Sequence, residues 1–264
     1  MLELKNITKI FNAGTVNEKI ALDDLSITLE DGDFVTVIGG NGAGKSTMLN
    51  AIAGTFPVDE GSIEIDGEDI TKLPEYLRAK LIGRVFQDPM TGTAADMWIE
   101  ENMSIAMRRG KSRGLGWAIN DSDRKIFREQ LKRLDLGLED RLSTKVGLLS
   151  GGQRQAITLL MAAMNNPKLL LLDEHTAALD PKTASKVLSI TKEIVEEEKL
   201  TTIMITHNMK DAITYGNRLI MMNSGKIILD IKGEEKAKLT VEDLLKAFAK
   251  AGSDGAANDR MLLI

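Results

Sequence analysis

The segment GGNGAGKST, residues 39–47, constrains the fold of this chain more than any other stretch. It fits the pattern GxxxxGK[ST] and directly follows the apolar run DFVTVIGG, so a buried strand should lead into it and a helix should open after it. Glycines let successive backbone N–H groups point inward, and the helix N-terminus adds partial positive charge. The segment therefore predicts a phosphate-binding loop. The alternative is a glycine-rich turn whose Lys45 is solvated.

The loop predicts a nucleotide site that also holds Mg²⁺. Lys45 would reach the β- and γ-phosphates, and the Ser46 hydroxyl would ligate the metal. The candidate binding residues of the loop are Gly39, Gly40, Asn41, Gly42, Ala43, Gly44, Lys45, Ser46 and Thr47.

The pattern of the rest of the chain is that of an α/β protein. Short alternating runs predict strands over residues 2–38, and residues 88–149 carry Met, Ala, Arg and Glu at helical spacing. From KLLLLD onward, strand-like and helical segments alternate as in a parallel-sheet core. VEDLLKAFAKA predicts a terminal helix that packs on the core or on a neighbour, and we expect the tail GSDGAANDR to be loose.

Composition narrows the function. The 264 residues are 43% hydrophobic and 28% charged, as expected for one folded unit, and the absence of cysteine excludes disulfides, thiolate zinc sites and a cysteine nucleophile. A net charge of −5 disfavours a broad nucleic-acid-binding surface. No apolar stretch approaches the ~20 residues that cross a bilayer, so we expect any work on a membrane to be done from outside the bilayer.

A second candidate phosphate site is LLSGGQRQA, residues 148–156. The spacing of Ser150 and Gln153 fits a capping box, which predicts a well-capped helix. Capping alone leaves Gly151 and Gly152 unexplained, whereas a helix start without Cβ atoms is a ready anion site.

LLDEHTAALD, residues 171–180, carries carboxylates at the end of an apolar strand. Asp173 is placed to hold Mg²⁺, and Glu174 is the candidate general base that orients the attacking water; the alternative is an ordinary polar strand end. Asp180 followed by Pro181 predicts a helix N-cap. Neighbouring side chains of an extended segment alternate sides, so we expect His175 to pack or hydrogen-bond rather than to complete a metal cluster.

These motifs, with the glutamine of VFQDP and the histidine of MITHN, resemble those of the ATP-binding subunits of ABC transporters. Six motifs occur in the family's order between about residue 2 and residue 232: Walker A, Q-loop, signature, Walker B, D-loop and switch histidine. The resemblance implies a P-loop NTPase (RecA-like) α/β core with an antiparallel β subdomain and an inserted helical subdomain, over about residues 88–155. It places an ATPase domain at residues 1–232 and a C-terminal helix and tail at 233–264.

The resemblance also implies roles for single residues. Gln87 would reach Mg²⁺ and the water, and His207 would contact the γ-phosphate; otherwise they are a polar loop residue and a structural histidine. Phe11 stands where the family stacks an aromatic ring on adenine, although it lacks the hydroxyl of the tyrosine often found there, and a core phenylalanine is the alternative. Asp180 would also make a D-loop contact across a dimer.

The implied assembly is a dimer, of two copies or with a similar ATPase subunit, in which Ser150, Gly151, Gly152 and Gln153 of one subunit close on the ATP of the other. The family further implies a separate transmembrane permease, an external substrate-binding protein reached indirectly, and a place on the cytoplasmic face of the membrane. Met97 and Trp98 stand where such a permease docks, or form part of the core. The basic stretch RRGKSRG, residues 108–114, is a solvated loop or a contact with the permease or anionic lipid.

Within the family, the absence of a permease segment favours an importer of bacterial or archaeal type. The sequence around the signature is similar to that of importers linked to amino acids. An exporter or lipoprotein-release subunit and the iron-sulfur assembly ATPase remain alternatives. A nucleotide-dependent scaffold without turnover would lack Glu174 or His207, and both are present.

Overall fold

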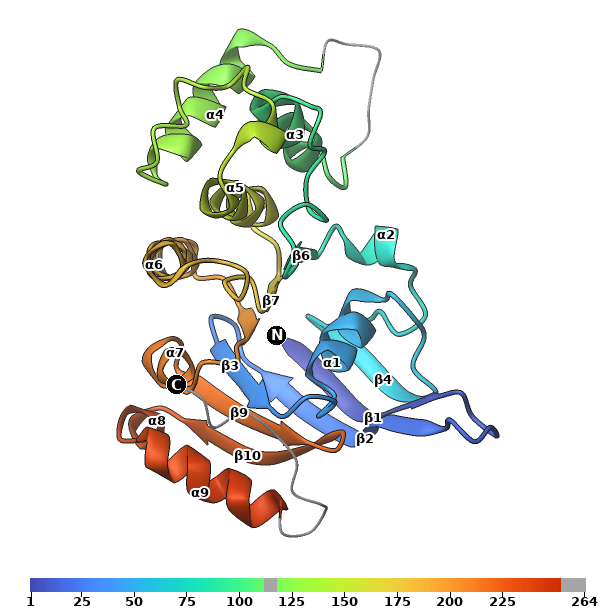
Figure 1. Ribbon diagram of the computed structural model, residues 1–264. Helices are drawn as coiled ribbons and strands as arrows, with labels where there is room; N and C mark the ends of the chain where they lie inside the picture. The colour runs from blue at the N-terminus through green and yellow to red at the C-terminus, as the bar shows by residue number, and fades with distance from the viewer. Residues whose placement is uncertain (112–117, 253–264) are drawn as a thin grey trace. The chain divides into compact units, whose positions relative to one another are not determined.

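The computed structural model describes residues 1–111 and 118–252 (Figure 1). The chain divides into two compact units. The first unit comprises residues 1–78 and the chain from residue 201 onward, and the second comprises residues 79–200. The tail GSDGAANDR lies outside the described residues apart from its first glycine, which ends the last helix, and three of the seven residues of the basic stretch at 108–114 also lie outside them.

An antiparallel sheet forms one layer of the first unit. Its strands run in the order β2-β1-β4-β5 and are β1 Leu2–Phe11, β2 Lys19–Leu29, β4 Glu60–Ile65 and β5 Glu68–Asp69. Leu4 of the first strand faces Ile27 on one side and Ile63 on the other, and all three side chains are buried. The polar and apolar alternation seen in the sequence therefore places one face of this sheet in the core.

The phosphate loop is carried by a second group of strands in the same unit. They run in the order β10-β9-β3-β8 and are β3 Phe34–Gly39, β8 Thr202–Ile205, β9 Arg218–Asn223 and β10 Lys226–Lys232. β3 pairs in parallel with both neighbours, and all six of its residues are buried. This explains its unbroken apolar sequence, since a parallel strand inside a sheet is covered on both faces.

The first unit has five helices among its described residues. They are α1 Lys45–Ala53, α2 Glu75–Arg78, α7 Met209–Thr214, α8 Glu234–Ala237 and α9 Val241–Gly252. Of these, α1 and α7 contact β3, and α8 contacts β10. Leu244 of α9 is fully buried in a cluster with Ile38, Leu219 and Met221. The expected packing of the terminal helix on the core is thus confirmed.

The second unit contains one parallel strand pair and most of the helical mass. Strands β6 Ile82–Val85 and β7 Leu169–Asp173 pair in register from Ile82 opposite Leu169. The helices are α3 Ile99–Met107, α4 Asp121–Lys132, α5 Gly151–Ala163 and α6 Pro181–Glu198, with a short 3₁₀ turn at Val146–Leu148. Helices therefore occupy the described part of the region between the two strands, as its residue spacing predicted.

Among the described residues, no helix has both the length and the apolar character needed to cross a bilayer.

Candidate functional site

The loop after β3 depends on two glycines at points of close backbone approach. A Cβ built on Gly39 would lie 2.4 Å from the Met222 carbonyl oxygen, and one on Gly44 would lie 2.6 Å from that of Ala21. Gly44 also has φ of 101°, a left-handed conformation that favours glycine. Only glycine fits at these two positions, so the motif's glycine pattern has a direct steric cause.

Lys45 is the first residue of α1, and its ammonium group lies on the loop itself. Its Nζ donates to the carbonyl oxygens of Gly39 at 2.8 Å and Gly40 at 3.1 Å, and the residue is 5% exposed. Gly44, the N-cap of α1, offers no side-chain acceptor to the first-turn amides. A positive charge and a helix N-terminus without a side-chain cap are thus combined at one loop, which suits an anion such as a phosphate group.

His207 lies at the same end of the sheet as this loop. Val37 of β3 pairs with Ile205 of β8, and the backbone N–H of Thr206 donates to the Val37 oxygen at 3.2 Å. His207 follows Ile205 by two residues, as Gly39 follows Val37. The imidazole is exposed, and Asn208 caps the next helix by accepting from the N–H groups of Lys210 and Asp211. Helix α7 therefore begins directly after Asn208.

Phe11 is the last residue of β1 and is only partly buried. Its ring makes an edge-to-face contact with Phe56, with centroids 5.4 Å apart. The simple alternative of a fully buried core phenylalanine does not describe it.

The second unit presents the predicted carboxylates at the end of β7. Asp173 ends the strand, and its Oδ2 lies 3.9 Å from Nη2 of Arg84 on the neighbouring β6. Glu174 follows with φ of 47°, a left-handed conformation that costs a non-glycine residue about 1 kcal/mol. This turn is closed by the Ala177 N–H, which donates to the backbone carbonyl oxygen of Glu174 at 2.9 Å. Backbone strain of this kind at a candidate catalytic residue is typical of functional sites.

His175 is buried and hydrogen-bonded, as expected. Its Nε2 lies 3.0 Å from the hydroxyl oxygen of Thr191 in α6, and that hydroxyl donates to the Val187 oxygen at 2.8 Å. The hydroxyl proton is thereby used, so the imidazole donates from Nε2. Burial lowers the pKa of His175 to about 4, which keeps the ring neutral. Among residues 1–111 and 118–252, no three His, Cys, Asp or Glu side chains are grouped as a metal site.

Ser150 caps α5 with the predicted capping box. The Gln153 N–H donates to the Ser150 hydroxyl oxygen at 3.3 Å, and the Ser150 N–H donates to the Gln153 side-chain oxygen at 3.2 Å. A Cβ on Gly152 would lie 2.1 Å from the methyl carbon of Thr183. Close packing of α5 on α6 therefore gives Gly152 a steric role that the sequence reasoning did not foresee. The anion site at residues 150–153 stays a prediction.

Gln87 and Asp180 are the two remaining predicted site residues, the first in a loop and the second at a helix N-terminus. Gln87 is exposed and lies two residues after the end of β6. Asp180 caps α6 by accepting from the Thr183 N–H at 3.1 Å, with Pro181 in the first turn, so the predicted cap is confirmed. Hydrogen bonds from Thr183 lower the pKa of Asp180, which keeps the carboxylate ionised.

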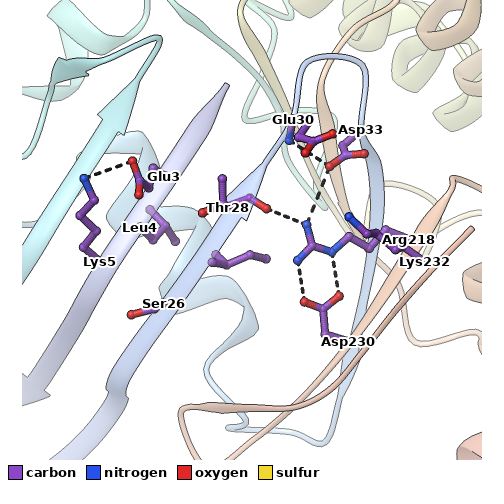
Figure 2. A pocket seen from close by; sticks show the side chains of 11 residues that line it. Glu3, Leu4, Lys5, Ser26, Thr28, Glu30, Asp33, Arg218, Asp230 and Lys232 are labelled. Atoms are coloured by element: carbon purple, nitrogen blue, oxygen red, sulfur yellow. Dashed lines mark hydrogen bonds and ion pairs between the residues drawn. The ribbon is translucent and has the colours of Figure 1, made fainter.

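A cavity of about 500 Å³ in the first unit carries no candidate residue. It lies among β1, β2, β9 and β10 (Figure 2). There Arg218 donates to both oxygens of Asp230, at 2.7 and 2.5 Å, and to the Thr28 carbonyl oxygen at 2.6 Å. This arginine connects β10 to β2 through an ion pair with Asp230 and a hydrogen bond to the Thr28 carbonyl oxygen, so its role is structural.

The second unit holds a smaller cavity, which the sequence reasoning missed. It measures about 320 Å³ and is lined mainly by α3 and α5. Nη2 of Arg109 donates to the Ala162 carbonyl oxygen at 2.9 Å, and burial lowers the pKa of this guanidinium. Nearby, Ile105 is 49% exposed. The basic run at 108–114 contains Arg109, but its placement against α5 becomes visible only in the fold.

Comparison with known proteins gives the family of the chain. The family model described as ABC transporter matches residues 22–177. The tyrosine transport ATP-binding protein of Clostridioides difficile is 45% identical over 251 residues, covering 95% of this chain and all of the relative. A methionine import ATP-binding protein of Enterococcus faecalis is 33% identical, over the whole of this chain and 74% of the relative.

Solved structures give the same result. An ATP-binding cassette dimer in a post-hydrolysis state bound to ADP and Pi has a TM-score of 0.75 at 33% identity, covering 88% of this chain and 98% of that one. An ATP-binding cassette of an ABC transporter in its ADP conformation has a TM-score of 0.76 at 30% identity, covering 94% of this chain and 98% of that one.

The fold and the phosphate loop define a P-loop ATPase cassette. The chain belongs to the ABC transporter family and is one of its ATPases.

Proposed function

We propose that this chain is the ATP-hydrolysing subunit of an ABC importer, binding two MgATP as a dimer and driving a separate permease for an amino-acid class of solute. The observation that carries the proposal is the placement of Lys45, whose ammonium group lies on a glycine loop that tolerates no Cβ at Gly39 or Gly44. The relatives that transport tyrosine and import methionine support the direction and the solute class.

In this proposal, the hydrolysis step uses groups that the fold presents at strand ends. Lys45 binds the β- and γ-phosphates, and His207 contacts the γ-phosphate. Glu174 accepts a proton from the water that attacks the γ-phosphorus, while the bond to the ADP oxygen breaks and inorganic phosphate leaves. Its ionised carboxylate must therefore point at the water, and the left-handed backbone at Glu174 sets the direction in which the side chain leaves the main chain.

Mg²⁺ fits the oxygen donors available. The Ser46 hydroxyl, the Asp173 carboxylate and the Gln87 amide oxygen are hard ligands of the kind this ion prefers, with water completing its shell. When bound, the ion neutralises charge on the phosphate oxygens. Arg84 beside Asp173 balances the charge of that carboxylate.

For the dimer, we propose that the signature residues of one subunit contact the ATP bound by the other. Ser150 is exposed at the N-terminus of α5, where first-turn amides favour an anion. A related cassette solved as a dimer bound to ADP and Pi supports this arrangement. Asp180, at the N-terminus of α6, would contribute to the same interface.

We propose that the permease docks on the cavity between α3 and α5. Its lining combines apolar side chains, such as Ile105 and Met161, with Arg109. In the described residues, no carboxylate lies within ion-pair distance of Arg109, and its guanidinium is partly desolvated. A partner helix that presents an acidic side chain over apolar ones would fit this surface, because it would supply the missing charge. Such docking would hold the subunit on the cytoplasmic face of the membrane, with a substrate-binding protein acting from the other side.

Trp98 is a second candidate contact for the permease. Its side chain is 44% exposed at the start of α3, so the alternative of a core tryptophan does not hold. Large aromatic side chains are enriched at protein interfaces, where they bury much area at little entropic cost.

Two measurements test the function. The Glu174→Gln variant should bind ATP and form a dimer on size-exclusion chromatography with MgATP, while its steady-state ATPase rate falls by roughly 10²-fold or more. Unimpaired hydrolysis would remove Glu174 from the mechanism. Affinity purification from solubilised membranes should recover a permease with the wild-type chain, and its absence there would argue against transport.

A further inference from the structure

We propose that Lys9 and Phe56 are positioning residues that hold the Phe11 ring as the platform on which the adenine base stacks. This inference rests on the proposed function, because it takes ATP as the bound nucleotide. It assigns roles to two residues that none of the sequence motifs contains.

The three groups form a compact triangle at the end of β1. The ring centroids of Phe11 and Phe56 are 5.4 Å apart with their planes at 83°. Nζ of Lys9 lies 5.6 Å from the Phe11 centroid and 5.5 Å from the Phe56 centroid. Edge-to-face ring pairs and cations within about 6 Å of a ring centroid are attractive geometries, so each member stabilises the other two.

Asp59 fixes this triangle to the strand. Its Oδ1 accepts from Lys9 Nζ at 3.0 Å, and its Oδ2 accepts from the Ile10 N–H at 2.6 Å. The Asp59 N–H also donates to the Thr8 carbonyl oxygen at 2.9 Å. Lys9 itself is 8% exposed. The ammonium group is therefore held in place and largely withdrawn from water, which strengthens its interaction with the rings.

The exposure of the rings indicates a binding role in addition to packing. Phe11 and Phe56 are both only partly buried, whereas a phenylalanine that serves the core, such as Phe127, is fully buried. A ring that is fixed from one side and still open to solvent can stack on a planar base with little further loss of side-chain entropy. Stacking of a base on an aromatic ring is a strong, orientation-dependent contact.

The experiment compares ligands with and without a base. Lys9→Met keeps the aliphatic stem and removes the cation, and Phe56→Ala removes the second ring. The matched control is Lys5→Met, since Lys5 lies on the same strand and pairs with Glu3 and Glu64, outside the ring cluster. For each variant we would measure KM and kcat for MgATP, the Kd of a fluorescent ATP analogue, and the inhibition constant of inorganic tripolyphosphate.

We expect Lys9→Met and Phe56→Ala to raise the KM and Kd for the nucleotides roughly fivefold, with kcat within about twofold of the wild type. Tripolyphosphate has no base, so its inhibition constant should not change. Phe56→Tyr, which retains the ring, should restore the nucleotide affinity, and Lys5→Met should resemble the wild type throughout.

Two results would overturn the inference. Nucleotide affinity unchanged in both variants would mean that the cluster only packs, and equal losses for ATP and tripolyphosphate would mean that it supports the phosphate loop. A wild-type chain that binds the fluorescent analogue without hydrolysing ATP would contradict the proposed function while leaving this test valid. A melting temperature measured for each variant identifies any that is not folded, and the milder Lys9→Met then decides.

Discussion

The imidazole of His175 donates from Nε2 to the hydroxyl oxygen of Thr191, 3.0 Å away. His175 directly follows the candidate general base Glu174 in the sequence. The chain has two histidines, and the structure separates their roles. His175 is 2% exposed and neutral, whereas His207 is exposed at the end of the sheet that carries the phosphate loop.

Replacing each histidine by alanine should therefore give opposite results. His175→Ala should keep the ATPase kcat within about threefold while lowering the free energy of unfolding by ~1–3 kcal/mol, because it empties a buried, hydrogen-bonded position. His207→Ala should lower kcat by roughly 10²-fold with little change in stability, because it removes the exposed group that we propose contacts the γ-phosphate. ATPase assays and urea unfolding of both variants check this. A large loss of kcat in a stable His175→Ala protein would give the buried imidazole a catalytic role.

Gly152 offers a test that separates packing from phosphate binding. Gly152→Ala places a Cβ 2.1 Å from the Thr183 methyl carbon, and overpacking of this kind costs ~1–3 kcal/mol. The double variant with Thr183→Ser removes that methyl group, so its melting temperature should return towards that of Thr183→Ser alone. If Gly152 also contacts the γ-phosphate, as we propose for the signature residues, the ATPase rate of the double variant should stay at least tenfold low. Recovery of both stability and activity would limit Gly152 to helix packing.

Lys236 should make stability depend on pH. Its Nζ donates to the carbonyl oxygens of Tyr215 and Gly216, the second at 2.8 Å, and burial lowers its pKa to about 8, against 10.5 for an ordinary lysine. Between pH 8 and 10.5 the unfolded chain therefore binds more protons at this group than the folded chain does. The contribution of Lys236 to the free energy of unfolding rises with pH across that window, by at most ~1.4 kcal/mol per pH unit, and is constant below it. In urea unfolding from pH 7 to 10, the free energy of unfolding of the wild type should rise with pH relative to that of Lys236→Met. A constant difference between the two proteins across this range would contradict the assignment.

Arg109 provides a charge test of the docking surface. Arg109→Glu should reduce the recovery of the permease from membranes at least tenfold. The new carboxylate would repel the acidic side chain that we expect on the permease. Lys132→Gln is a suitable control, since Lys132 pairs with Glu129 on an exposed face of α4. Equal recovery of the permease with both variants would place the docking surface elsewhere. If an acidic side chain of the permease opposes Arg109, changing that side chain to arginine should restore binding to Arg109→Glu.

The sequence was most informative where structure is local. The N-caps at Ser150, Asp180 and Asn208 and the left-handed C-cap at Gly54 all form as residue type and spacing indicate. Each depends on contacts within about four residues, so a short stretch of sequence is enough to predict it.

The sequence was least informative where partners are distant along the chain. Arg84 beside Asp173, and Thr183 against Gly152, involve residues on different elements. The strand pairing and helix packing that bring them together depend on the whole fold. Phe11 could be chosen by its place in the pattern of the family that the sequence resembles, but its contact with Phe56, forty-five positions on, could not be predicted.

Leu244 of the terminal helix shares a core with Ile38, the residue immediately before Gly39. Removing α9 would thus expose Ile38, and with it the apolar core next to the nucleotide loop, to water, although every motif would still be intact. Conversely, a protein that binds α9 would change the stability of the nucleotide loop through this shared core, without contacting ATP.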